Sequence, residues 1–234
     1  MLIAKLPRLS PAATPKKRAA RIASHATVAL AAVAVVLCCG SASAQITKLF
    51  AHDDVAISGA DVITTSVSGT VPGAVPPTTV VTEKASNSAV LLFSGRYTHS
   101  NLVGLEFNYG FTQFAENFST SSTLNGPPQT AVSEFTFGYI LHAPKFFGTV
   151  PFLGAGAGTM KFSPTPLGGL ALPVQARMVY YGTLGLDAPF TRRFGMRTQI
   201  RDLIYMAPDY GQNYLTIGKR AQSIEPTIGF YFHF

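Results

Sequence analysis

The chain has 234 residues, with 18 Lys+Arg and 11 Asp+Glu and a formal net charge of +7. Six of the basic residues, none of the acids and both cysteines lie within residues 1–44, so the remainder carries a net charge of only +1. This balance excludes nucleic-acid binding by a basic surface, and it leaves residues 45–234 without disulfide or thiol chemistry.

The first 44 residues read as an export signal. A basic segment precedes the apolar run of residues 26–39, which is too short to span a bilayer. Ala42, Ser43 and Ala44 then give the small-x-small pattern of a signal-peptidase site. We expect cleavage between Ala44 and Gln45, with an organellar transit peptide as the alternative.

The remaining residues, 45–234, are expected to form one domain built of β-strands. No stretch in them has the length and apolarity of a transmembrane helix. Alternating segments are instead separated by clusters of Gly, Pro, Ser and Asn. The predicted strands are 53–66, 88–98, 101–113, 130–142, 149–162, 175–188, 194–205 and 221–234.

The connections between these strands alternate in length. Short turns are expected near 99–100, at 143–148 and at 189–193, and long loops at 67–87, 114–129, 163–174 and 206–220. Eight strands of mostly 11–14 residues, with all long loops at one end, are typical of transmembrane barrels. The pattern predicts an all-β fold, an eight-stranded antiparallel up-and-down transmembrane β-barrel.

Strict alternation within the strands separates an aromatic face from a polar one. In 101–113, for example, Phe107 and Phe111 oppose Glu106 and Asn108. An eight-stranded barrel is narrow enough for side chains to fill it. We therefore predict a lumen closed by an ion-pair network, with a narrow ion path as the alternative. The predicted members are Arg96, Glu106, Glu134, Arg177, Asp187, Arg197, Arg201 and Glu225.

The end of the chain carries the most specific signal. Ile228, Phe230, Phe232 and the terminal Phe234 share one face of the last strand, which would make an aggregation-prone edge in a soluble protein. The other interpretation is an ordinary core strand in a periplasmic β-sandwich. This ending resembles the C-terminal signature of the small OmpA/OmpX-like outer-membrane β-barrel proteins, and residues 50–234 as a whole resemble that family.

The resemblance implies insertion into the outer membrane of a Gram-negative bacterium by the barrel assembly machinery, which reads the last strand. It also implies contact with outer-membrane lipid and lipopolysaccharide. We expect a monomer that binds neither nucleic acid nor a cofactor.

Candidate chemical motifs are few. The run Gly154–Gly158 lacks the third glycine and following helix of a dinucleotide site, and no pair of histidines has metal-ligand spacing. Ser223 and His233 lie more than ~30 Å apart on one strand, too far for a catalytic pair. We predict no catalytic, cofactor or metal site. The expected role is structural or adhesion-like, through surface loops that bind an extracellular ligand. The alternatives are a small channel and, third, a lipid-modifying enzyme.

Overall fold

The computed structural model describes residues 53–70, 80–98, 100, 102–118, 127–166, 168 and 170–234. The predicted signal peptide, with Ala42, Ala44 and Gln45, lies outside these residues. No helix in the described ranges is long and apolar enough to cross a bilayer.

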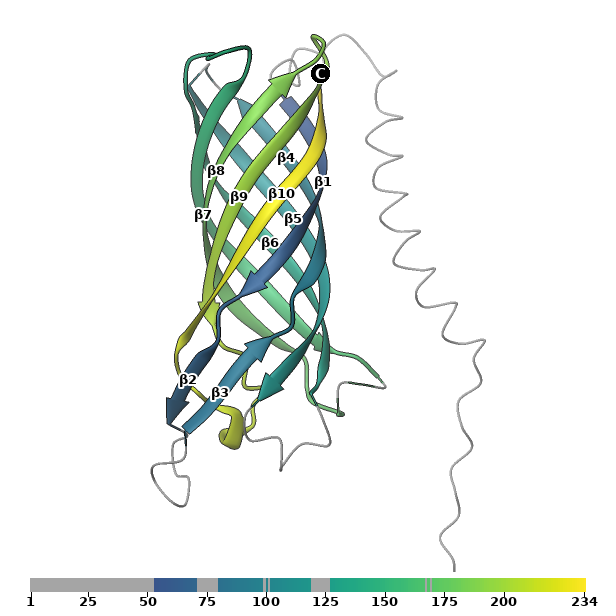
Figure 1. The fold of residues 1–234 in the computed structure, drawn as a ribbon, viewed down its shortest axis with the longest axis vertical. Coiled ribbons are helices and arrows are strands. Elements are labelled where there is room, and N and C mark those ends of the chain that lie inside the picture. The colour runs from purple at the N-terminus through teal and green to yellow at the C-terminus, as the bar shows by residue number, and fades with distance from the viewer. Residues whose placement is uncertain are drawn as a thin grey trace, which may run out of the picture. The chain divides into compact units, whose positions relative to one another are not determined.

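Ten strand segments form eight barrel strands (Figure 1). The first barrel strand is β1 followed by β2, and the second is β3 followed by β4, each with a short break. The bounds are β1 Asp53–Thr64, β2 Val67–Thr70, β3 Val80–Ala85, β4 Ser88–Thr98, β5 Val103–Phe118, β6 Gln129–His142, β7 Val150–Pro164, β8 Gln175–Pro189, β9 Phe194–Met206 and β10 Arg220–His233.

All neighbouring strands are antiparallel, and the sheet closes on itself. β1 pairs with β10, so that Asp54 lies opposite His233, and β5 pairs with both β4 and β6. Closure leaves the ladder without a free edge. The predicted eight-stranded antiparallel barrel is confirmed. We call the end where β1 begins and β10 ends the terminal end, and the opposite end the loop end.

The barrel is longer at the loop end than predicted. The predicted loop 67–87 contains β2 and β3, which pair with each other and extend the wall beyond β1 and β4 (Figure 1). The predicted loop 114–129 begins with the last five residues of β5, three of which pair with β3. The predicted bounds of these two loops were therefore wrong. The strands continue into them with polar residues facing outward and apolar residues facing inward.

That reversal is visible along β5. From Val103 to Phe111 the apolar side chains point outward, and the polar ones point into the lumen. Beyond Phe111 the pattern inverts: Gln113 and Asn117 face outward, whereas Phe114 and Phe118 are buried inside. An apolar exterior suits lipid and a polar exterior suits water, so the inversion marks where the wall leaves the hydrocarbon.

The outward apolar side chains form a belt around the barrel. Their exposure is high for large hydrophobic groups, with Phe107 at 50% and Leu184 at 65%. The four C-terminal residues of the predicted assembly signal lie in this belt: Ile228, Phe230, Phe232 and Phe234 are 59%, 50%, 39% and 40% exposed. Such a surface would aggregate in water and is matched by lipid.

Candidate functional site

The lumen near the terminal end holds a cluster of buried charges. Arg96 donates from Nε to Glu106 Oε1 at 2.7 Å, and its Nη1 lies 3.2 Å from Asp187 Oδ2. Arg197 makes a two-bond contact with the same Asp187 carboxylate, at 2.7 and 3.0 Å, and also donates to Asp54 Oδ2 at 3.0 Å. Planar guanidinium groups suit such bidentate pairing. Because β4 and β8, which carry Arg96 and Asp187, are four strands apart around the eight-stranded ring, the cluster ties opposite walls together.

A second cluster lies next along the lumen, around Arg201. Its Nη1 donates to Glu225 Oε2 at 2.7 Å, and its other terminal nitrogen contacts Glu134. The guanidinium carbon also lies 5.5 Å from the centre of the Tyr181 ring. Arg201 is fully buried, and both its carboxylate partners are at most 3% exposed. The site is therefore a compact charged contact that excludes solvent.

Seven of the eight charged residues that were predicted to line the lumen belong to these two clusters. The exception is Arg177, which lies apart at the loop end with Asp209 as its partner, 2.9 Å away. The sequence prediction missed Asp54, although Asp54 lies on the same inward face of β1 as Ser58. That these clusters close the lumen to ions remains a proposal.

Toward the loop end the lumen becomes apolar. One buried cluster joins side chains from most of the wall and from the segment between β9 and β10. Its larger members are Phe114, Phe118, Val132, Met160, Phe162, Val179, Tyr181, Leu203, Tyr205, Tyr210, Leu215 and Ile217. The loop half of the barrel thus has a packed core like that of a soluble protein.

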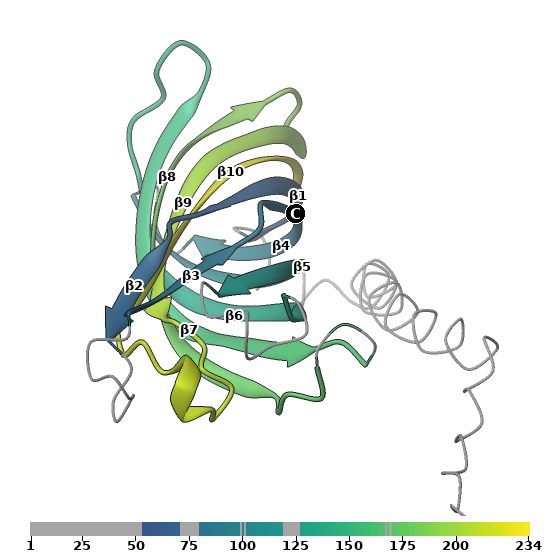
Figure 2. The ribbon, with the colours of Figure 1, turned by 60° about the horizontal axis from the view of Figure 1, so that its bottom comes forward.

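The segment 207–219 contains a short 3-10 turn at Asn213–Leu215 and lies at the loop end (Figure 2). Four of its residues, Ala207, Tyr210, Leu215 and Ile217, belong to this core. Leu215 and Ile217 are at most 6% exposed. A Cβ on Gly69 of β2 would lie 2.6 Å from both the Cγ2 and the carbonyl oxygen of Ile217, so only glycine permits this approach. We call residues 207–219 the inward-folded loop.

Polar contacts fix the inward-folded loop to the wall. Tyr210, fully buried and held at a φ of 50°, donates its hydroxyl hydrogen to Glu116 and lies 2.9 Å from Thr130 Oγ1. A positive φ is costly for a tyrosine, so the surrounding contacts must hold it. Asp209 accepts from Gln175 at 2.7 Å and pairs with Arg177.

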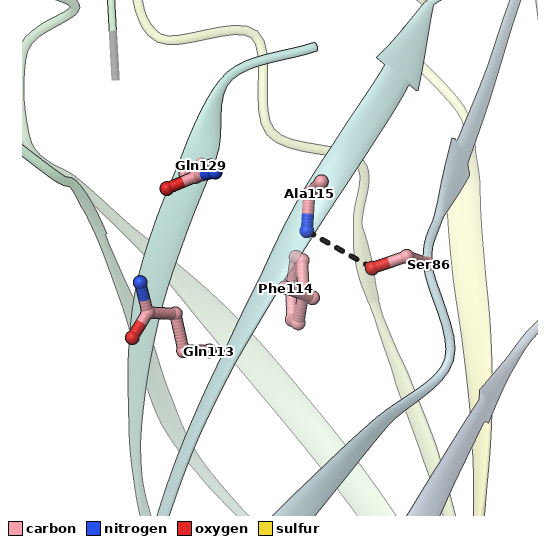
Figure 3. Close-up of a pocket in the computed structure, with 5 residues that line it drawn as sticks. All are labelled: Ser86, Gln113, Phe114, Ala115 and Gln129. Carbon is pink, nitrogen blue, oxygen red and sulfur yellow. Dashed lines mark hydrogen bonds between the residues drawn. The ribbon is translucent and has the colours of Figure 1, made fainter. Parts of the chain in front are cut away.

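A recess of about 250 Å³ lies in the barrel wall at the loop end (Figure 3). It is lined by Ser86, Gln113, Phe114, Ala115 and Gln129. It lies beside the break between β3 and β4, which contains Ser86. There the Ser86 hydroxyl accepts a hydrogen bond from the Ala115 amide at 3.0 Å (Figure 3), and the Ser86 amide donates to the Ala115 carbonyl oxygen at 2.8 Å.

Two solved structures are similar to this barrel. The neisserial surface protein A structure is 14% identical, with a TM-score of 0.52, over 78% of this chain and 97% of that one. The outer membrane protein OprG of Pseudomonas aeruginosa is 13% identical, with a TM-score of 0.56, over 79% of this chain and 96% of that one. The chain has the fold of the small eight-stranded outer-membrane β-barrels.

No protein-family model matches the sequence, and no curated protein matches it. The exposed apolar belt agrees with the fold: a closed barrel whose outer surface is matched only by lipid is an outer-membrane protein.

Beyond the belt, at the loop end, burial shifts the ionisation of two acids. Burial raises the pKa of Glu116 to about 8, although the hydrogen bond from Tyr210 acts in the other direction. Burial, and then the neighbouring Glu116, raise the pKa of Glu83 well above its ordinary value. Below about pH 8 the Glu116 carboxyl group therefore keeps its proton while the loop is folded inward, and the pKa of Glu83 is shifted in the same direction. Burial likewise raises the pKa of Tyr210.

We expect the inward-folded loop to open more readily as pH rises between 4.5, the ordinary pKa of a glutamate, and about 8. Within this window the closed state keeps a proton on Glu116 that an exposed carboxyl loses, so higher pH favours opening. Hydrogen exchange of the amides in residues 207–219, corrected for intrinsic rates, would measure it. The double variant Glu83→Gln, Glu116→Gln should remove most of the pH dependence. Protection independent of pH in the wild type would contradict the assignment.

Proposed function

We propose that this protein is an adhesion-like surface-interaction protein whose barrel serves as a closed membrane support. The observation that carries the proposal is the filling of the lumen. Two charge clusters occupy its terminal half, and a packed apolar core with an inward-folded loop occupies its loop half. A barrel filled in this way contributes anchorage, which leaves the long connections as the regions available for binding.

The connections suited to this role are residues 71–79, between β2 and β3, and 119–126, between β5 and β6. The strands next to them, β2, β3 and the end of β5, lie at the loop end and extend beyond the lipid-facing belt. The proposal places this end outside the cell and the terminal end in the periplasm. It assigns no catalytic residue.

Shortening residues 71–79 and 119–126 to brief Gly-Ser turns tests the proposal. We expect bacteria that display the variant to lose binding to cultured epithelial cells and immobilised matrix proteins. The boiled and unboiled protein should still differ in gel mobility, as a folded barrel does. The matched control shortens the terminal-end connection 143–148 and should bind like the wild type. Undiminished binding by the loop variant would contradict the proposal.

A narrow channel is the second candidate, because the two charge clusters follow one another along the lumen. Conductance in planar bilayers separates the two functions. A closed support gives no steady current, and neither Arg96→Ala nor Glu134→Ala should create a defined one. A regular single-channel current from the pure wild type, altered by these substitutions, would favour the channel.

A further inference from the structure

Two acidic side chains lie near each other inside the loop end of the barrel. Glu83 of β3 lies opposite Phe118 of β5, and Glu116 of β5 lies opposite Ala85 of β3, so the two acids occupy diagonal positions on the inward face of this strand pair. Long side chains in such positions are within reach of each other. Glu83 is 6% and Glu116 is 1% exposed, so the pair is closed off from solvent while the inward-folded loop is in place.

Each of these carboxyl groups has one oxygen that accepts no hydrogen bond from a described residue. These oxygens are Oε2 of Glu83 and Oε1 of Glu116. The other oxygen of Glu116 accepts from the Tyr210 hydroxyl, which also lies 2.9 Å from Thr130 Oγ1. A buried carboxylate without partners is costly, so the pair needs either protons on its carboxyl groups or a cation between them.

The charges around the pair match a divalent cation. Asp209 and Arg177 act on Glu83 in addition to Glu116, so three carboxylates and one guanidinium meet here, with a net charge of −2 when all are ionised. Arg177 lies 2.9 Å from Asp209 and neutralises that acid. Lys84, the neighbour of Glu83 in the chain, faces outward. The two negative charges of the ionised pair are therefore left without a cation among the described residues.

The available ligand atoms suit a hard cation. Carboxylate and hydroxyl oxygens are the ligands that calcium prefers, and calcium accepts about six to eight of them in irregular geometry. The carboxylates of Glu83 and Glu116 and the hydroxyl of Thr130 provide such oxygens, and water that enters with the ion supplies the rest. Magnesium needs near-ideal octahedral geometry and fits this arrangement less well.

We propose that Glu83 and Glu116 bind a calcium ion that fixes the inward-folded loop to the barrel wall. The ion lies between the two oxygens that lack partners, and the Tyr210 hydroxyl on Glu116 connects the loop to the site. Calcium and protons then stabilise the same closed state in alternative ways. Without calcium, the two carboxylates repel each other once they ionise, and the loop opens as pH rises. The site does not involve the long connections 71–79 and 119–126, so it can hold even if they bind no ligand.

Calcium chloride titrated into the refolded barrel in phosphatidylcholine nanodiscs, at pH 6 and at pH 8.5, tests the proposal by calorimetry. We expect one saturable site at pH 8.5 and release of protons on binding. The affinity should fall on the order of tenfold for each pH unit below about 8, because the ion displaces a proton from Glu116. Calcium should also slow hydrogen exchange in residues 207–219 at pH 8.5. Sodium chloride at equal ionic strength should not, because screening alone fixes no loop.

The double variant Glu83→Gln, Glu116→Gln keeps the shape of the protonated acids and should therefore fold, as gel mobility would show. It should bind calcium more than about 100-fold more weakly, since it loses ligands and not only their supporting groups. The matched control, Asp61→Asn, removes an exposed acid from the outward face of β1 and should bind like the wild type. Equal binding by the double variant and the control would overturn the proposal. So would the absence of saturable binding by the wild type at pH 8.5, or equal protection of the loop by sodium chloride.

Discussion

Replacing Arg201 with methionine is expected to lower the free energy of unfolding by about 3–5 kcal/mol, the usual cost of removing one partner from a buried ion pair. Methionine fills much of the arginine's volume but leaves the buried Glu134 and Glu225 without a cation. Urea-induced unfolding in lipid vesicles, followed by gel mobility, measures the change.

The control for this experiment neutralises the partners as well. Adding Glu134→Gln and Glu225→Gln to Arg201→Met should recover most of the lost stability, because the penalty comes from uncompensated charge. Arg177→Met, at the partly exposed loop-end pair, should cost no more than about 1 kcal/mol. A loss that the two glutamines fail to recover would show that Arg201 acts by packing.

Replacing Gly156 of β7 with alanine is expected to cost about 3 kcal/mol or to prevent assembly, because the site is overpacked. A Cβ there would overlap the Phe137 carbonyl oxygen and would lie 2.6 Å from Tyr181 Cε1. The first contact is with backbone of the paired strand and cannot be relieved by a side-chain rotation. Heat-dependent gel mobility after refolding would report the defect.

Gly182→Ala provides the matched comparison, since no atom lies within 4 Å of the position that a methyl group would occupy at this glycine of the adjacent strand β8. That variant should fold with nearly wild-type stability. Similar losses at Gly156 and Gly182 would mean that strand propensity, and not crowding by Tyr181 and the backbone, explains the effect.

The two-residue alternation predicted the barrel well because residues that face lipid are apolar, whereas the residues between them face the lumen and are polar. Phe107 and Glu106 could be assigned to opposite faces from their order alone, and the predicted strand 88–98 coincides with β4. The prediction failed where water replaces lipid outside the wall. There Phe114 and Phe118 point inward, whereas Phe107 and Phe111 point outward. For this reason β2, β3 and the end of β5 were predicted as loops.

The candidate sites, too, were predicted only in part. The lumen face of each strand identified Arg96, Glu106, Arg201 and Glu225 as inward charges, but not which carboxylate each arginine would contact. Strand register and barrel diameter decide that, because Arg96 reaches Asp187 across the lumen as well as Glu106 on the neighbouring strand. The wall recess had no sequence signal, since it lies beside the short break between β3 and β4, which the alternation of residues does not predict.

The sequence by itself predicted the closed transmembrane barrel, the lipid-facing belt and the inward placement of the charges, because a two-residue period with one aromatic face suits strands that lie between lipid and a polar lumen. Only the tertiary structure decided how the lumen is filled. The partition into two charge clusters, the position of Arg177 outside them and the inward-folded loop held by Tyr210 and Glu116 depend on contacts between residues far apart in the chain. Such contacts are set by register and closure, which local alternation does not encode.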